Sequence, residues 1–399
     1  GGNTVGSASV AVGHAALLVQ NPATATDMYN VAVGHAAGLN VTTGVRNTLI
    51  GGLAGDALTD AGSNVAIGYN SMTTNTSGSD NVAVGRGTLE NYNVTTTTST
   101  FNVAIGHEAG NDITTGLRNI LVGGRAGDAL QDADYNIAIG VDALSADTFG
   151  SRAVAVGTDA LATQNFTTAN DNYNIGVGYG AGQRITSGVQ NTLVGGLVGD
   201  SLTDADMNVA VGYAALSADT QGSESTAIGR GALANQNFST ATDSHNVAVG
   251  HSAGQQMTTG IKNVLVGADA GLQLTDADFN VAIGHLALDA DTLGSGSVAV
   301  GLQALSSQNF ATATSPLNVA VGFQAGLSVT TGVQNTLIGA SAGDALTTGA
   351  DNVALGSTAL SGDTAGADSV AVGRRALQTQ NFSTTTSTYN TAVGSNAGQ

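Results

Sequence analysis

Cysteine and tryptophan are absent from this 399-residue chain, proline occurs twice, and phenylalanine and tyrosine occur eight times each. Without cysteine the chain has no disulfide framework and no thiolate metal site, which leaves its redox compartment open. So few aromatic residues exclude the usual filling of a large globular core. No apolar run approaches the roughly 18 residues of a membrane-spanning helix, so we expect no membrane insertion.

Positive charge is also scarce. Ten lysines and arginines face 29 acidic residues, for a formal net charge of −19, which excludes nucleic acid and anionic membranes as partners. The 57 glycines argue against helices, because each costs about 1 kcal/mol in a helix interior. The remaining apolar content is mainly Ala, Val, Leu and Ile, which favours closely stacked strands.

The dominant feature is a repeated pentapeptide of the form Asn-Val-Ala-Val-Gly, present 22 times. Its copies recur at successive spacings of 21, 17, 17 and 17, and this order defines a 72-residue super-repeat that starts near positions 9, 81, 153, 225, 297 and 369. We predict a single continuous repeat array over residues 1–399. The array begins and ends partway through a coil, so we expect an interior segment of a longer polypeptide.

Within each motif the side chains alternate between two faces, as in Val82, Ala83 and Val84. We expect the branched pair to fill the interior of a coil and the Ala face to form a second surface, against a neighbouring subunit. Turn signals such as residues 42–44 mark a second corner, and a 17-residue coil is too short for a crossover helix. The sequence therefore predicts an all-β parallel solenoid, in which the insert of each 21-residue coil, such as Asn165-Phe166, bulges outward.

Asparagine opens 17 of the 22 motifs, and stacked coils would align these amides in a hydrogen-bonded ladder. We interpret the ladder as structural. Its predicted members include Asn30, Asn47, Asn64, Asn81, Asn102, Asn119, Asn136, Asn174, Asn191 and Asn208.

A calcium site is the sharper hypothesis for the acidic turns, where Asp-Ala-Asp places alternate oxygen ligands on one side of an extended segment. A solvated acidic turn is the alternative, because no complete loop with a bidentate Glu is present. No other cofactor is required. The candidate ligands are Asp132, Asp134, Asp204, Asp206, Asp276 and Asp278.

The serial Asn-Val-Ala-Val/Ile-Gly motif, followed by Ala-Gly or Ala-Leu, resembles the YadA-like head repeats of trimeric autotransporter adhesins and the related repeats of bacteriophage tail fibres. The resemblance covers all 22 motifs. It implies a left-handed parallel β-roll assembled as an intertwined or side-by-side homotrimeric fibre. The longer coils and the strict four-coil super-repeat depart from the adhesin heads and favour the tail-fibre branch.

Recurrence of almost every polar residue once per super-repeat argues against an enzyme, because an active site needs a unique arrangement. We expect an extracellular fibre shaft of a virion tail fibre, which presents a receptor-binding tip. The chain itself would be its partner in the trimer, and a host cell-surface receptor would be bound by regions outside this segment. Scarce aromatic residues favour a spacer over a sugar-binding surface. The alternative is a trimeric adhesin on a bacterial cell surface.

Overall fold

The computed structural model describes residues 3–399, which fall into two compact units, residues 3–204 and 205–399. Both units consist of short strands joined by turns, and residues 3–399 contain no helix. No segment of this described part is a helix that could cross a membrane. The all-β prediction is therefore confirmed.

In each unit, eleven short strands form one parallel sheet. In the first unit these are β2 (Val10–Val12), β4 (Val31–Val33), β5 (Thr48–Ile50), β6 (Val65–Ile67), β8 (Val82–Val84), β10 (Val103–Ile105), β11 (Ile120–Val122), β12 (Ile137–Ile139), β14 (Val154–Val156), β16 (Ile175–Val177) and β17 (Thr192–Val194). In the second unit they are β18 (Val209–Val211), β20 (Thr226–Ile228), β22 (Val247–Val249), β23 (Val264–Val266), β24 (Val281–Ile283), β25 (Val298–Val300), β26 (Val319–Val321), β27 (Thr336–Ile338), β28 (Val353–Leu355), β30 (Val370–Val372) and β32 (Thr391–Val393).

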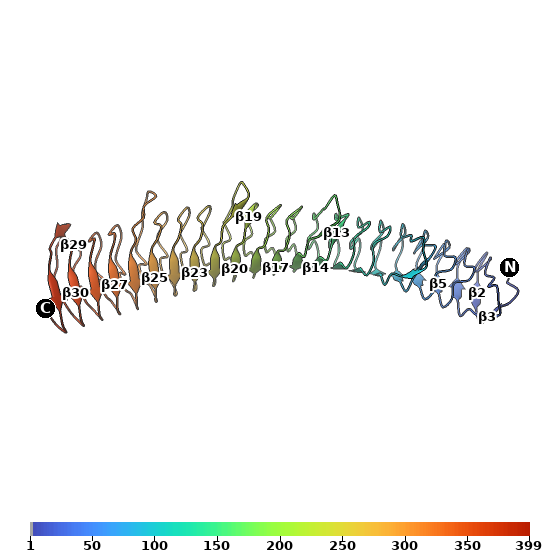
Figure 1. The fold of residues 1–399 in the computed structure, drawn as a ribbon, viewed down its shortest axis with the longest axis horizontal. Coiled ribbons are helices and arrows are strands. Elements are labelled where there is room, and N and C mark those ends of the chain that lie inside the picture. Colours follow the sequence, from blue (N-terminus) through green and yellow to red (C-terminus); the bar gives the residue numbers. More distant parts are fainter. Residues whose placement is uncertain (1–2) are drawn as a thin grey trace. The chain divides into compact units, whose positions relative to one another are not determined.

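Every strand of these sheets is the middle of one pentapeptide, and within each unit consecutive strands pair in parallel. Ala83 pairs with Ala104 across a coil that carries an insert, and Ala104 pairs with Leu121 across a coil without one. Parallel pairing of consecutive turns, visible as stacked arrows within each unit (Figure 1), defines a parallel β-solenoid. The predicted solenoid fold is confirmed.

Short pairs of strands mark the coils that flank five of the six inserts, and at the remaining insert Gly294 and Thr314 form an isolated parallel bridge. Each pair is parallel, for example Gly78 beside Thr98. The strands are β1 (Gly6–Ser7) with β3 (Thr26–Asp27), β7 (Gly78–Ser79) with β9 (Thr98–Ser99), β13 (Gly150–Ser151) with β15 (Asn170–Asp171), β19 (Gly222–Ser223) with β21 (Thr242–Asp243), and β29 (Gly366–Ala367) with β31 (Thr386–Ser387).

The insert loops project beyond the neighbouring turns, as near β13 and β19 in Figure 1, but their phenylalanines turn inward. Phe166, Phe238 and Phe310 are buried. Phe238 lies against Gly222, where an added Cβ would approach its ring to 2.7 Å. The phenylalanine of the insert therefore packs into its coil and extends the apolar core.

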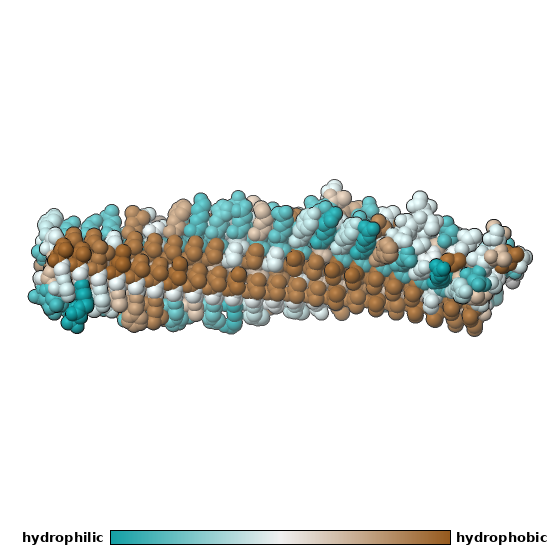
Figure 2. All heavy atoms as spheres, turned by 60° about the horizontal axis from the view of Figure 1, so that its bottom comes forward, coloured by the Kyte–Doolittle hydropathy of each residue, from teal (hydrophilic) through white to brown (hydrophobic). Residues whose placement is uncertain are grey.

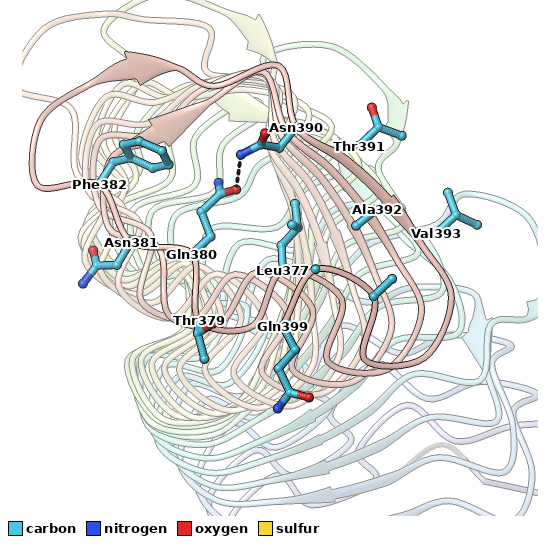
Figure 3. A pocket seen from close by; sticks show the side chains of 12 residues that line it. Leu377, Thr379, Gln380, Asn381, Phe382, Asn390, Thr391, Ala392, Val393 and Gln399 are labelled. Atoms are coloured by element: carbon cyan, nitrogen blue, oxygen red, sulfur yellow. Dashed lines mark hydrogen bonds between the residues drawn. The ribbon is translucent and has the colours of Figure 1, made fainter.

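The two faces of each strand point in the opposite directions to those we expected: the alanine face points into the coil and the branched face points outward. The motif alanines, such as Ala83 and Ala138, are fully buried, whereas their branched neighbours Val82 and Ile139 remain partly exposed or exposed. Figure 3 shows the same arrangement at the last strand, where Ala392 points into the coil and Val393 points away from it. The alternation was correct, but its assignment to interior and exterior was wrong.

The reason is that larger side chains from the facing corner already occupy the narrow interior. Leu161, buried beside its strand, leaves so little room that a Cβ added at Gly176 would lie 2.9 Å from the Leu161 Cγ. Only a small residue fits opposite such a leucine, so the branched residues point outward.

Each coil bends at left-handed residues, three of them in the coil of β12. Tyr135, Asp142 and Leu144 have φ of 60°, 55° and 54°. The motif glycine is a further special position: Gly85 has φ of 141°, and a Cβ there would lie 2.2 Å from the carbonyl oxygen of Gly106. These bends close each coil into one narrow turn.

Candidate interaction face

The outer surface of the sheet is the most unusual feature of the molecule. Two branched residues of every motif point outward. Parallel stacking aligns them in two rows, and within each row the residues of consecutive turns lie about 4.8 Å apart. Figure 2 shows them as brown rows in each unit. The members with the most exposed side chains are Val10, Val12, Ile50, Ile105, Ile120, Ile139, Val209, Ile228, Ile283, Ile338 and Val393. We call this surface the apolar face.

Two columns of side chains border the apolar face. We call the residue before each motif Asn, such as Tyr135, the leading edge, and the residue after each motif Gly, such as Tyr179, the trailing edge. All ten exposed aromatic residues lie in these two columns. They are Tyr29, Phe101, Tyr135, Tyr173, Phe279 and Tyr389 on the leading edge, and Tyr69, Tyr179, Tyr213 and Phe323 on the trailing edge.

Exposed aromatic residues are therefore more numerous than we expected from the composition. On the leading edge of the first unit they alternate with arginines between Phe101 and Tyr173. The Arg118 guanidinium lies 5.3 Å from the ring centre of Tyr135, and that of Arg152 lies 5.1 Å from the same ring and 5.9 Å from the ring of Tyr173. Cation–π contacts of this kind keep the column ordered along the stack.

Behind the apolar face, asparagine side chains hold consecutive strands in register. The backbone N–H of Asn47 donates to Asn30 Oδ1 at 2.9 Å, and Asn47 Nδ2 donates to the carbonyl of Ala61 at 2.9 Å. Equivalent bonds join Asn47, Asn64, Asn81, Asn102, Asn119 and Asn136 in succession. All of these asparagines are fully buried, so their amides are satisfied inside the coil.

The ladder has a gap at Ala153, whose backbone N–H still donates to Asn136 Oδ1. It resumes at Asn174, which bonds to Asn191. In the second unit Asn208 accepts from the N–H of Ser225. The ladder residues are therefore fixed groups of the scaffold and offer no free amide to a ligand.

Sequence reasoning missed a buried polar site that occurs once in most super-repeats. Asp219 Oδ2 accepts from Gln236 Nε2 at 2.6 Å, while Asp219 Oδ1 accepts from the backbone N–H groups of Gly222 and Phe238. Gln236 Oε1 in turn accepts from Asn246 Nδ2 at 2.9 Å. The equivalent carboxylates, all fully buried, are Asp147, Asp291 and Asp363.

Burial raises the pKa of Asp147, and hydrogen bonds from Gln164 and from the backbone N–H groups of Phe166 and Gly150 act in the opposite direction. The hydrogen bonds offset part of the cost of burial, which is why the coil can accommodate a carboxyl group in its interior. The signal in the sequence was the joint recurrence of Asp and Gln, one coil apart, at these inserts.

The predicted calcium ligands make hydrogen bonds to the coil that precedes them. Asp132 Oδ1 accepts from Thr115 Oγ1 at 2.6 Å, and Asp134 Oδ1 accepts from the N–H of Leu117 at 2.7 Å. In the second unit Asp276 and Asp278 make the same two bonds, with Thr259 and Ile261.

Of the remaining two candidates, Asp204 accepts from Thr203 Oγ1 at 3.2 Å, and the N–H of Asp206 donates to Ser223 Oγ. No group of three or more acidic, histidine or cysteine side chains that could hold a metal occurs among residues 3–399. Calcium binding at these turns stays a prediction.

A further set of aspartates is half-buried, with one carboxylate oxygen lacking a hydrogen bond: Asp56, Asp128, Asp200, Asp289 and Asp344. Burial raises the pKa of each of them, and that of Asp128 rises to about 6. At neutral pH each charge is therefore held at a cost to stability.

A hollow lies at the last turn of the second unit (Figure 3). It is lined by Leu377, Gln380, Phe382 and Ala392, and Gln380 Oε1 accepts from Asn390 Nδ2 at 2.8 Å. These residues are the repeated interior of a coil, seen where no further turn covers it. We assign the hollow no ligand.

Comparison with known proteins adds no relative: no protein-family model matches the sequence, and no curated protein is significantly similar to it.

Proposed function

We propose that this chain is a shaft segment of an extracellular homotrimeric fibre, most simply a virion tail fibre that presents a receptor-binding tip. In this proposal each chain is a left-handed β-roll of 17- and 21-residue coils in a 72-residue super-repeat. The observation that supports it is the apolar face, which a single chain leaves in contact with water along all eleven strands of each unit.

Association is the physical remedy for such a surface. Soluble monomers rarely expose a continuous apolar patch of more than a few hundred Å², and larger patches mark sites of protein contact. Because the face repeats at every turn, its natural partner is an equally repetitive surface, which another copy of the chain provides.

The acidic charge is consistent with a spacer. Net negative charge keeps a long apolar-faced rod soluble and repels nucleic acid and anionic membranes. In the proposal the chain requires no cofactor and performs no catalysis, and a host receptor is bound by regions outside this segment.

Solution mass tests the proposal. Light scattering should give about three times the 39.1 kDa of one chain, in the presence and absence of a calcium chelator. Dissociation on chelation alone would promote the acidic turns to metal sites. A monomer under both conditions would contradict the homotrimer.

Substitution of the apolar face locates the contact. Replacing Ile120, Ile139 and Ile283 together by Lys should dissociate the assembly, because buried unpaired charges are costly. The matched control replaces Thr167, Ser239 and Ala311, equivalent exposed residues of the inserts, by Lys and should leave the mass unchanged. Firm binding of the intact segment to host cells would instead favour a surface adhesin.

A further inference from the structure

A small pocket opens on the surface of the second unit, beside the trailing edge. Its volume is about 90 Å³, enough for a group of a few heavy atoms. Three consecutive coils supply its walls, which include Tyr213, Arg230, Gly231, Ala234, Ser252 and Gln255. No residue of the apolar face lines it, so the pocket is a separate feature of the surface.

The first unit contains the same frame two super-repeats earlier, at Arg86 and Gly87, but there a carboxylate fills it. Glu90 Oε1 accepts from Asn70 Nδ2 at 3.1 Å, and Glu90 Oε2 accepts from Asn111 Nδ2 at 3.2 Å. A Cβ added at Gly87 would lie 3.0 Å from Glu90 Oε2. The space beside this glycine is therefore occupied by an acidic side chain of the chain itself.

The second unit lacks both carboxylates of this frame. Ala234 stands at the position of Glu90. Ser252 replaces Glu108, whose Oε1 lies 3.9 Å from Arg86 Nη1 in the first unit. The two replacements remove the acids and leave the arginine of the frame in place.

Hydrogen-bond donors remain at the walls of the open pocket. The nearest atom to a Cβ added at Gly231 would be Gln255 Nε2 at 3.6 Å, followed by Ser252 Oγ at 3.8 Å. Ser252 is only 6% exposed, and among residues 3–399 no hydrogen bond involves its hydroxyl group or the side-chain amide of Gln255. Within the same residues the Arg230 guanidinium forms no ion pair and bonds only to His251 Nε2, at 3.0 Å. An amide, a hydroxyl and most of a guanidinium group are therefore available to a ligand.

We propose that this pocket binds a carboxylated sugar of the hexuronic acid class. The carboxylate of the sugar takes the place that Glu90 occupies in the first unit, and it accepts hydrogen bonds from Arg230 and Gln255. The sugar ring lies against the exposed ring of Tyr213, which forms one wall of the pocket. The site goes beyond the proposed shaft function and does not rest on self-association of the chain.

Titration calorimetry with D-glucuronate tests the site, and we expect one molecule to bind per chain. D-glucose lacks the carboxylate and acetate lacks the ring. We expect each to bind at least ~10-fold more weakly than glucuronate, because a charge-assisted hydrogen bond or a stacked surface is lost. Equal binding of glucose would overturn the assignment of a carboxylate, and equal binding of acetate would overturn the assignment of a sugar. Absence of glucuronate binding would overturn the site itself.

Removal of the cation gives a second readout. Arg230→Ala should weaken glucuronate binding at least ~10-fold, because the carboxylate loses its charged partner. The matched control is Lys262→Ala in the same unit: Lys262 Nζ also lies near an aromatic ring, 5.5 Å from the centre of Phe279, but on the leading edge and away from the pocket. The control should bind like the wild type. An equal loss in both variants would assign the binding to overall charge and contradict the site.

Filling the pocket uses the first unit as its template. Ala234→Glu with Ala214→Asn introduces the carboxylate and the amide that Glu90 and Asn70 provide in the first unit, so the circular dichroism spectrum should not change. We expect glucuronate binding to weaken at least ~10-fold, because the introduced carboxylate occupies the space and repels the ligand. Retained binding would place the sugar elsewhere and overturn the site.

Opening the equivalent place in the first unit is the converse experiment. A variant with Asn70→Ala, Glu90→Ala, Glu108→Ser and Asn111→Gln carries the residues of the second unit around Arg86. We expect it to bind two glucuronate molecules per chain in place of one. A stoichiometry that stays at one, with an unchanged circular dichroism spectrum, would overturn the equivalence between Glu90 and the ligand.

Discussion

Two kinds of coil occur in succession along the chain. They share the same backbone path but differ in the side chains that fill the interior. In the coils with Gly110 and Gly127, glycine occupies a left-handed corner, and Leu121 fills the space between them: a Cβ at either glycine would come within 2.8 Å of a Leu121 methyl group. Buried Ile113 and Leu130 complete an apolar layer.

In the coils that flank an insert, leucine occupies the same corner and a polar residue follows. Leu216 and Leu233 take the left-handed conformation, with φ of 53° and 49°, and the next interior position holds Asp219 or Gln236. The comparison teaches that one narrow turn can be closed either by interlocking methyl groups or by a buried hydrogen-bond network. The two solutions should respond differently to mutation.

Truncating Leu121, the central side chain of the apolar layer, should have the largest effect on stability. Leu121→Ala leaves a cavity between two glycine corners, and we expect a loss of about 4 kcal/mol in the free energy of unfolding. Thermal or urea unfolding measures it. The outward-facing neighbour provides the control, since Ile120→Ala removes an exposed side chain and should cost well under half as much in the single chain.

Breaking the polar layer should cost somewhat less. Asp219→Ala leaves Gln236 Nε2 and the N–H groups of Gly222 and Phe238 without an acceptor, for an expected loss of about 3 kcal/mol. The exposed Asp243→Ala is the matched control and should change little. A loss below about 1 kcal/mol for Asp219→Ala would show that water replaces the carboxylate and that the layer is not dry.

The sequence was sufficient for the solenoid because one pentapeptide both forms a strand and sets the spacing of the stack. It did not predict which face of each strand lies inside the coil. Val82 and Val84 are more hydrophobic than Ala83, so hydrophobicity alone placed them inside, whereas opposite a corner leucine the interior has room only for a small residue such as Ala83. Width is a property of the closed turn and is invisible in a strand pattern.

Left-handed corners at leucine were equally unpredictable, because a leucine in that conformation is strained and carries no local signal. An indirect signal did exist: the same repeat position is Gly110 in one coil and Leu144 in another, and glycine commonly replaces residues with positive φ. For the buried network, Asp219 resembled an ordinary turn residue, and only its recurrence together with Gln236 set it apart.

The smallest expected effect is a pH dependence of stability caused by Asp128, a half-buried acid in one of the apolar coils. The pKa of Asp128 is raised to about 6 by burial, from an ordinary value of 3.8. Both the folded and unfolded states bind the proton below about pH 4, and only the folded state keeps it between about pH 4 and 6. Stability therefore falls as pH rises through that window and stays lower above it.

Asp128→Leu removes this penalty, and its side chain is already accepted at the equivalent Leu272 two super-repeats later. We expect the variant to be more stable than the wild type at pH 7 by up to about 1 kcal/mol, since solvent screens a half-exposed group, and the difference to shrink below about pH 4. Unfolding midpoints at pH 3.5 and 7 measure it. A difference independent of pH would assign the gain to packing, and a loss at pH 7 would mean that the Asp128 carboxylate has a partner in the proposed fibre.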